Sequence, residues 1–123
     1  MTYLKLWQTG RNKYHAKKTM VNGKKYDSLK EGSKAMELEQ LKKNKAIKDF
    51  ESHKKIELFG ENGTRVCNYF ADFVIEHNDG TTEILDIKSK ITATPVFRLK
   101  WKMLEDKYKD EVKRGEVKLT IEY

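Results

Sequence analysis

Two aspartates stand inside stretches whose other residues predict buried β-strands. Asp72 lies within YFADFVI (residues 69–75), and Asp86 lies within ILDIK (residues 84–88). Aspartate is disfavoured in strand interiors, and a carboxylate between hydrophobic neighbours is costly to desolvate unless it is paired or bound to a metal. The pattern therefore predicts either a divalent-cation site or a pair of buried structural aspartates.

The loop between the two strands decides whether the aspartates meet. If residues 78–80 (Asn-Asp-Gly) form a three-residue loop, Asp72 lies directly opposite Asp86, whereas a two-residue loop would place them on opposite faces of the sheet. A three-residue loop that ends in a glycine with positive φ is a common hairpin type. Facing carboxylates repel each other unless a divalent cation lies between them, and Mg²⁺ favours a few carboxylates with waters and phosphate oxygens.

Two further residues can complete such a site. Lys88 shares a strand face with Asp86, where it would orient a water or stabilise a charged phosphate, although a lysine at a strand end is usually solvated. Glu31 points toward the packed side of the first predicted helix, and Gly32 after it would permit a close approach of a sheet or a phosphate. Ser28-x-x-Glu31 is also typical of a capping box, in which the glutamate only satisfies a backbone N–H. Both interpretations of Glu31 stay open.

The remaining pattern predicts the elements that position these residues. We expect an irregular segment over residues 1–18, followed by a two-stranded ribbon around an Asn22-Gly23 turn, because both residues tolerate the positive φ of a type I′ turn. A helix then begins at Asp27 or Ser28, and a second helix follows Pro95 with an apolar stripe. The predicted α/β (α+β) fold has the order αβββαβ after the ribbon, in one domain whose basic arm and ribbon span residues 1–26 and whose core spans 27–123. The expected elements are a helix to about Lys48, strands at 56–59, 65–76 and 82–88, a helix with the stripe Phe97, Trp101, Leu104 and Tyr108, and a strand over 117–123.

The charge is unevenly placed along the 123 residues. The net charge is +7, and residues 1–30 hold eight of the 26 basic residues but only one of the 19 acidic ones, interleaved with aromatic side chains. A basic, aromatic-bearing arm on a neutral body favours a polyanionic partner such as nucleic acid, with a solubilising tail as the alternative. The predicted phosphate contacts are Arg11, Lys13, Lys17, Lys18, Lys24 and Lys25 in the arm, and Arg98, Lys100 and Lys102 on the second helix.

Composition excludes several classes of protein. No stretch approaches the ~20 consecutive apolar residues of a membrane span, and the first ten residues lack the apolar run of a signal peptide. The single cysteine, Cys67, excludes a disulfide framework and a multi-cysteine zinc site. We therefore expect a soluble protein of a reducing compartment, the cytoplasm, with no membrane partner.

Asp72 followed by Asp86-Ile87-Lys88, in an αβββαβ order, resembles the PD-(D/E)xK nuclease superfamily. Within it, the chain is similar to small phage-encoded proteins that look like Holliday-junction-resolving endonucleases. The matching segments are residues 12–14, 26–31, 69–73, 86–88 and 94–97, so that the resemblance covers most of the chain from about residue 12.

The resemblance implies a restriction-endonuclease-like core with a mixed central sheet, and Mg²⁺ or Mn²⁺ as cofactor. It implies Asp72 and Asp86 as metal ligands, Lys88 as the catalytic lysine and Glu31 as the carboxylate that completes the site. It also implies a homodimer that cuts DNA, for which we expect branched DNA in phage recombination inside a bacterial host cell. Ala71 replaces the proline that names the motif, and Asp86 stands where many members carry Glu. A nicking, flap or restriction-like endonuclease and a non-catalytic nucleic-acid-binding protein are the alternatives.

Overall fold

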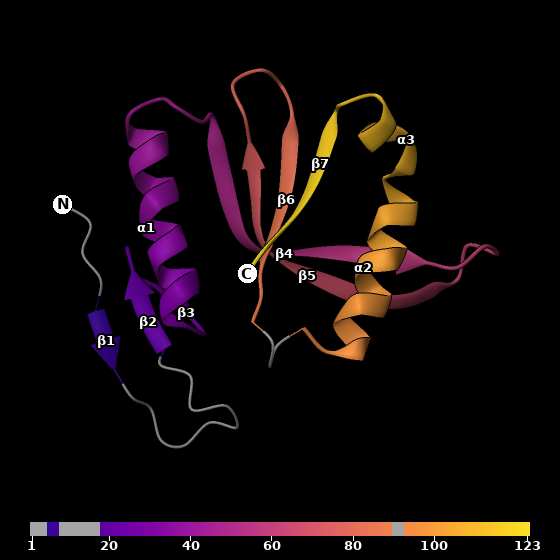
Figure 1. The fold of residues 1–123 in the computed structure, drawn as a ribbon, viewed down its shortest axis with the longest axis horizontal. Helices are drawn as coiled ribbons and strands as arrows, with labels where there is room; N and C mark the ends of the chain where they lie inside the picture. Colours follow the sequence, from indigo (N-terminus) through magenta and orange to yellow (C-terminus); the bar gives the residue numbers. More distant parts are fainter. Residues whose placement is uncertain (1–4, 8–17, 90–92) are drawn as a thin grey trace. The chain divides into compact units, whose positions relative to one another are not determined.

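The computed structural model describes residues 5–7, 18–89 and 93–123, with side chains from Met20 onward (Figure 1). The described chain is mixed α+β, and after a small β-ribbon its elements follow the predicted order, with one additional short helix before the last strand. The chain divides into two compact units, residues 1–47 and 48–123, which are described separately. No helix in the described part is both long and apolar enough to cross a membrane.

The first unit begins with a three-stranded antiparallel sheet. β1 (Lys5–Trp7) pairs with β2 (Lys18–Val21), which pairs with β3 (Lys24–Tyr26). Asn22 and Gly23 have φ of 50° and 79°, as the predicted type I′ turn requires. The expectation of an irregular start was wrong for residues 5–7, because a three-residue strand is too short to show an alternating pattern.

Helix α1 (Leu29–Lys43) completes the first unit and ends five residues earlier than predicted. Ala35 and Leu38 are buried, so the helix packs along one narrow apolar stripe. Lys45 follows with a φ of 60°, a left-handed conformation that stops the helix just after its C-cap. Lys45 and Lys48, which were predicted to belong to the helix, therefore lie beyond its end.

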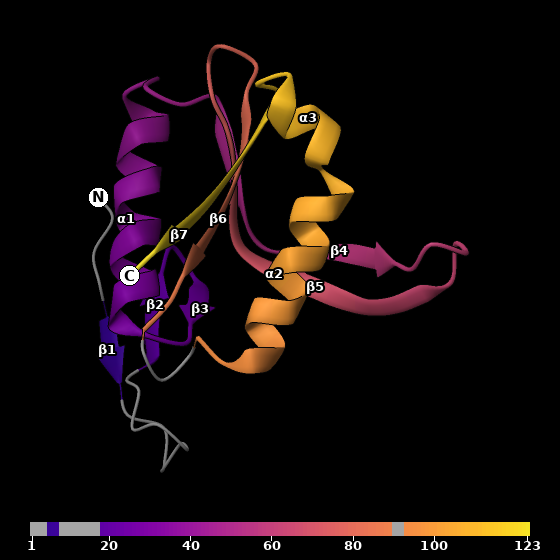
Figure 2. The same ribbon diagram turned by 45° about the vertical axis from the view of Figure 1, so that its right-hand side comes forward.

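The second unit is a four-stranded mixed sheet covered by helices. The strands lie in the order β4-β5-β6-β7, the first three antiparallel and β7 parallel to β6. A parallel neighbour requires a crossover, which α2 and α3 supply as they pass along one side of the sheet (Figures 1 and 2). The elements are β4 (Asp49–Phe59), β5 (Arg65–Glu76), β6 (Thr82–Ile87), α2 (Pro95–Lys107), α3 (Lys109–Lys113) and β7 (Val117–Glu122).

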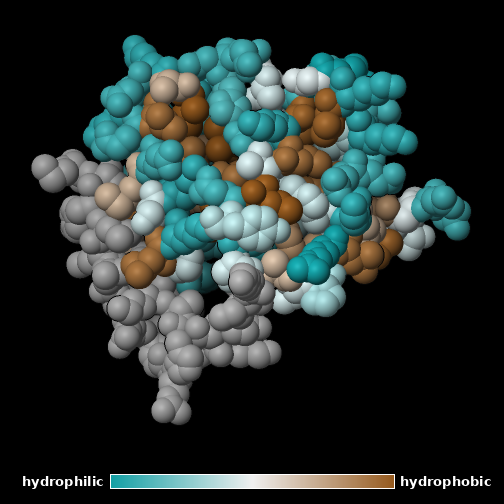
Figure 3. All heavy atoms as spheres, viewed as in Figure 1, coloured by the Kyte–Doolittle hydropathy of each residue, from teal (hydrophilic) through white to brown (hydrophobic). Residues whose placement is uncertain are grey.

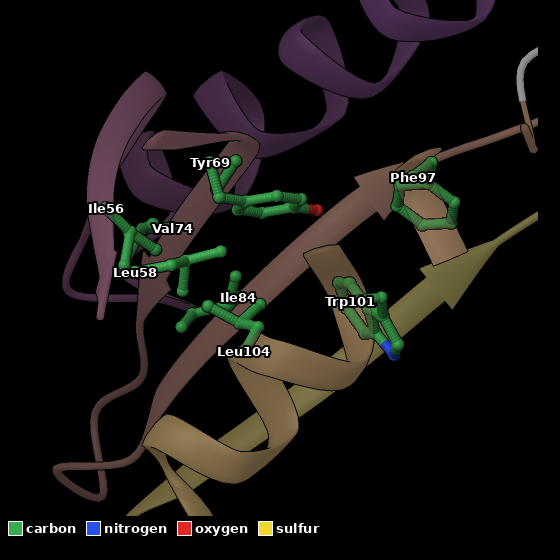
Figure 4. Close-up of a cluster of buried hydrophobic side chains, with 9 residues drawn as sticks. Ile56, Leu58, Tyr69, Val74, Ile84, Phe97, Trp101 and Leu104 are labelled. Carbon is green, nitrogen blue, oxygen red and sulfur yellow. The ribbon is translucent and has the colours of Figure 1, made fainter. Parts of the chain in front are cut away.

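The core of this unit lies between the sheet and α2. Figure 4 shows side chains from β4, β5 and β6 meeting those of α2. Phe97, Trp101 and Leu104, the predicted stripe, are buried, while Tyr108 at the helix C-cap is only half-buried. Thr94 accepts a hydrogen bond from the Phe97 N–H and Pro95 occupies the first turn, which together fix where the helix begins.

Strand β4 is longer than predicted and contains a kink. It begins at Asp49 and not at Ile56. Its first half is mostly polar, with Phe50 and Ser52 half-buried, and its pairing with β5 is what makes it a strand. His53 has a φ of 56°, which interrupts the regular pairing opposite Asp72. The β4–β5 hairpin bends sharply in both ribbon views, and its far end extends past α2 (Figures 1 and 2).

The left-handed residue in β4 leads to a test of the kink. Replacing His53 by valine is expected to lower the free energy of unfolding by about 1–3 kcal/mol, because a β-branched residue is strained at positive φ. Asparagine, which tolerates this conformation, is the matched control at the same position. Urea denaturation of both variants measures the difference, and equal stability of the two would show that the kink is not retained in solution.

A polar cluster joins β6 to β7 on the sheet. Glu83 accepts a hydrogen bond from the Thr120 hydroxyl (2.7 Å), and its other oxygen lies 2.8 Å from His77 Nε2. Burial alone would raise the pKa of the Glu83 carboxyl, but the contacts from Thr120 and His77, with the charge of Lys118, lower it below 4.5.

This lowered pKa predicts a pH-dependent contribution to stability. The contribution of Glu83 is fully present above the unfolded-state pKa of about 4.5 and is lost as the pH falls through the lower folded-state value. Glu83→Gln is therefore expected to be less stable than the wild type at pH 7, with a gap that narrows below about pH 4.5. Thermal melts of both proteins across pH 3 to 7 test this, and a gap independent of pH would contradict it.

Candidate functional site

The hairpin that joins β5 to β6 has the loop on which the site depends. The His77 N–H donates to the Thr81 carbonyl (2.9 Å), which leaves three residues in the loop, and Gly80 has a φ of 90°. Phe73 pairs with Leu85, and the same register brings Asp72 opposite Asp86. The predicted register is confirmed, so both aspartates lie at one place on the sheet.

The two carboxylates replace backbone acceptors where the regular ladder stops. Regular pairing of β5 with β6 ends at Phe73 and Leu85. Beyond that point the Asp72 N–H donates to Asp86 Oδ1 (3.0 Å), and the Ile87 N–H donates to Asp72 Oδ2 (2.8 Å). Each carboxylate thus accepts a hydrogen bond from a backbone N–H of the other strand, and the pair holds the two strands together. Asp86 is 1% exposed and Asp72 9%, so both anions are largely removed from water.

Asp86 receives two further contacts, from Tyr69 and Lys88. The Tyr69 hydroxyl donates to Asp86 Oδ2, and Lys88 Nζ lies 3.4 Å from the same oxygen. Burial of the ring, followed by the negative charges of Asp86 and Asp72, raises the pKa of Tyr69 far above its ordinary value of 10. Tyr69 therefore remains a hydrogen-bond donor across the physiological range. The Lys88 ammonium also lies 4.5 Å from the centre of the Phe97 ring, a cation–π contact that fixes its position.

Asp72 and Asp86 fit a Mg²⁺ site built on two carboxylates, but not one built on three or more protein ligands. Among the described residues, no group of three or more His, Cys, Asp and Glu side chains is gathered for a metal ion. Mg²⁺ is, however, commonly held by one or two carboxylates, with waters and substrate phosphates as its other ligands. Asp72 and Asp86 together match this smaller set. The ammonium of Lys88, whose side chain is 18% exposed, compensates part of their charge.

Glu31 lies in the first unit and caps α1. Its N–H donates to the Ser28 hydroxyl (3.1 Å), and its Oε2 accepts from the Asp27 N–H (3.2 Å). This is close to the predicted capping box, except that the carboxylate reaches the residue before the N-cap. Its role as a third metal ligand stays a prediction.

The predicted phosphate contacts differ in their surroundings. Arg11, Lys13 and Lys17 lie outside the described residues, and so does the side chain of Lys18 in β2. Lys24 and Lys25 on β3, and Arg98 and Lys102 on α2, are exposed as a phosphate contact requires. Lys100 donates to the Asn68 carbonyl (3.1 Å) and is half-buried, so it ties α2 to β5 in this structure.

Sequence reasoning missed two residues of the site, Tyr69 and Phe97. A regular strand would place Tyr69 and Asp72 on opposite faces, so alternation gave no signal that both reach Asp86. Phe97 was predicted as part of the core stripe, and only the return of α2 across the sheet places its ring beside Lys88.

Comparison with known proteins gives one match. A family model described as "Protein of unknown function (DUF1064)" matches residues 11–121. The comparisons with curated proteins and with solved structures give no match.

Proposed function

The chain belongs to the DUF1064 family, whose description names no activity, and we propose its function from the candidate site. We propose that it is a Mg²⁺- or Mn²⁺-dependent endonuclease. Its substrate is branched DNA, such as Holliday junctions, in which it hydrolyses phosphodiester bonds. One observation carries the proposal. Two buried carboxylates from adjacent strands face each other, with an ammonium group 3.4 Å from one of them. The ordered motif that resembles the PD-(D/E)xK nucleases coincides with these residues.

The chemistry assigned to each residue follows from its position. A divalent cation at Asp72 and Asp86 would bind the scissile phosphate and lower the pKa of a bound water. Asp72 and Asp86 contribute negative oxygens whose orientation is fixed by backbone N–H groups. Tyr69 holds Asp86 in place by donating to Oδ2, the same oxygen that Lys88 contacts. Lys88 then orients the attacking water or offsets charge that develops on the phosphate.

The charge distribution supports a substrate recognised by its backbone. The basic residues of the N-terminal arm, with exposed Arg98 and Lys102, would contact phosphates, which position DNA without reading its sequence. Such contacts suit an enzyme that recognises the shape of a branch. Cutting both strands of a junction requires two active sites, and a symmetric homodimer supplies them.

Cleavage of defined DNA substrates tests the proposal. The wild type is expected to cut at least one of a four-way junction, a flapped duplex and a linear duplex in the presence of Mg²⁺ or Mn²⁺. Asp72→Asn is expected to lower that rate at least a thousandfold, because it removes one of the two negative carboxylates that would hold the cation. The rates are measured from gel-resolved products over time, with circular dichroism to confirm that the variant is folded.

A rival function has its own supporting observation. Every described oxygen contact of Asp86 comes from a donor of the chain itself, as expected for a purely structural aspartate in a non-catalytic nucleic-acid-binding protein. Calorimetric titration with Mn²⁺ separates the two functions, because the rival predicts no Asp72-dependent binding. Absence of cleavage of all three substrates with either cation would refute the endonuclease. Cutting of the linear duplex at one sequence would refute branch recognition only.

A further inference from the structure

A long groove runs between β7 and the helices α2 and α3, in the second unit. It consists of two hollows of about 620 and 430 Å³ that share Glu105. Its floor is apolar because alternate residues of β7 (Val117, Leu119 and Ile121) point toward the helices. Figure 3 shows hydrophobic residues reaching the surface along the line where Figure 1 places β7 beside α2 and α3.

The rim of this groove is basic and one end of it is aromatic. Arg98, Lys102, Lys109 and Lys118 line it and are exposed. The single acidic lining residue, Glu105, lies 3.7 Å from Lys102 Nζ in an exposed ion pair, so the rim keeps an excess of positive charge. At one end the Tyr123 ring is 71% exposed and Leu99 is 64% exposed. Large side chains left in water beside cations are the composition of surfaces that stack nucleobases and hold the phosphates between them.

The aromatic end of the groove and the candidate site share one side chain, that of Phe97. Phe97 lines the smaller hollow, and its ring also lies 4.5 Å from Lys88 Nζ, which contacts Asp86. This end of the groove therefore lies two side-chain contacts away from Asp86, through Phe97 and Lys88.

We propose that this groove binds a single-stranded nucleic acid arm and delivers its junction with the duplex to Asp72 and Asp86. The bases would stack on Tyr123 and rest on the apolar floor, while Arg98 and Lys102 contact the phosphates. The link to cleavage rests on the proposed function. It adds to the proposed function a preference, among branched DNAs, for branches that carry an unpaired strand, such as a flapped duplex.

Binding is tested without cleavage, by fluorescence anisotropy of an oligothymidylate of about 12 nucleotides in the presence of EDTA. Tyr123→Ala is expected to weaken binding at least fivefold, and Tyr123→Phe is expected to restore it because the ring is kept. The double variant Arg98→Glu with Lys102→Glu is expected to weaken binding more than tenfold. Lys55→Glu, which changes an exposed charge on β4 outside the groove, is the control and is expected to have a small effect.

The same variants are then compared in cleavage of a flapped duplex. Loss of oligothymidylate binding in Tyr123→Ala with a matching loss of flap cleavage supports both the groove and the proposed function. Unchanged oligothymidylate binding in Tyr123→Ala and in the double variant overturns the groove, whereas Asp72-dependent cleavage would still uphold the endonuclease. Groove-dependent binding by a wild type that cuts no DNA overturns the endonuclease and keeps the groove. If Tyr123→Ala instead abolishes self-association and leaves oligothymidylate binding intact, the groove binds a second copy of the chain and the proposal is wrong.

Discussion

Replacing Lys88 by methionine is expected to slow DNA cleavage about 100-fold or more, since the ammonium group is the only described cation in contact with Asp86. The same change is expected to destabilise the protein when no divalent cation is present. Removing one partner of a buried ion pair costs about 3–5 kcal/mol of stability. We expect a loss of about 3 kcal/mol, because Asp86 keeps its contacts from Tyr69 and the Asp72 N–H. Methionine keeps the length and the apolar stem of the lysine, so the loss reports the charge.

Mg²⁺ makes this result decisive. If a cation binds Asp72 and Asp86, it supplies the positive charge that the variant lacks. Mg²⁺ at about 10 mM is therefore expected to raise the stability of Lys88→Met more than that of the wild type. Urea denaturation with Mg²⁺ or with EDTA measures this difference, and Lys55→Met controls for loss of a lysine from an exposed site. A variant that loses stability but gains none from Mg²⁺ would indicate a purely structural role for Lys88.

Leu104→Ala is expected to cause the largest loss of stability in the second unit, about 3 kcal/mol within a usual range of about 2–5. Leu104 is 0% exposed and lies among Ile84, Trp101 and other buried residues between α2 and the sheet. Truncation removes buried methyl groups and leaves a cavity whose rigid strand-borne walls limit collapse.

Leu99→Ala is the matched control for this loss. Leu99 lies on the same helix but is 64% exposed, so its truncation is expected to change the free energy of unfolding by less than about 0.5 kcal/mol. Chemical denaturation of both variants gives the comparison. Similar values for the two leucines would mean that α2 does not pack on the sheet through the stripe of Phe97, Trp101 and Leu104.

The fold was predictable wherever one face of an element is strongly apolar. β5, β6 and α2 carry dense hydrophobic patterns, and their types and approximate bounds followed from sequence alone. The first half of β4 was not predictable, because its polar residues form a strand through pairing with β5 and not through burial of their own side chains. β1 was missed for a related reason, since three residues carry too little pattern.

The candidate site divides in the same way. The meeting of Asp72 and Asp86 was predictable, because a three-residue loop ending in Gly80 fixes which residues face each other. The contact of Tyr69 with Asp86 was not, because the ladder is interrupted opposite His53 and the alternation of side chains no longer applies across it. Whether these residues perform catalysis stays a prediction.

The parallel pairing of β7 has a consequence for the order in which the chain folds. β4, β5 and β6 are joined by tight loops, so their contacts close only short stretches of chain, whereas β7 can reach β6 only after the segment that forms α2 and α3 has turned back. Closing the longer stretch costs more chain entropy, and distant pairings form later on average. We therefore expect the hairpin that carries both carboxylates to be assembled early, before its parallel neighbour is added.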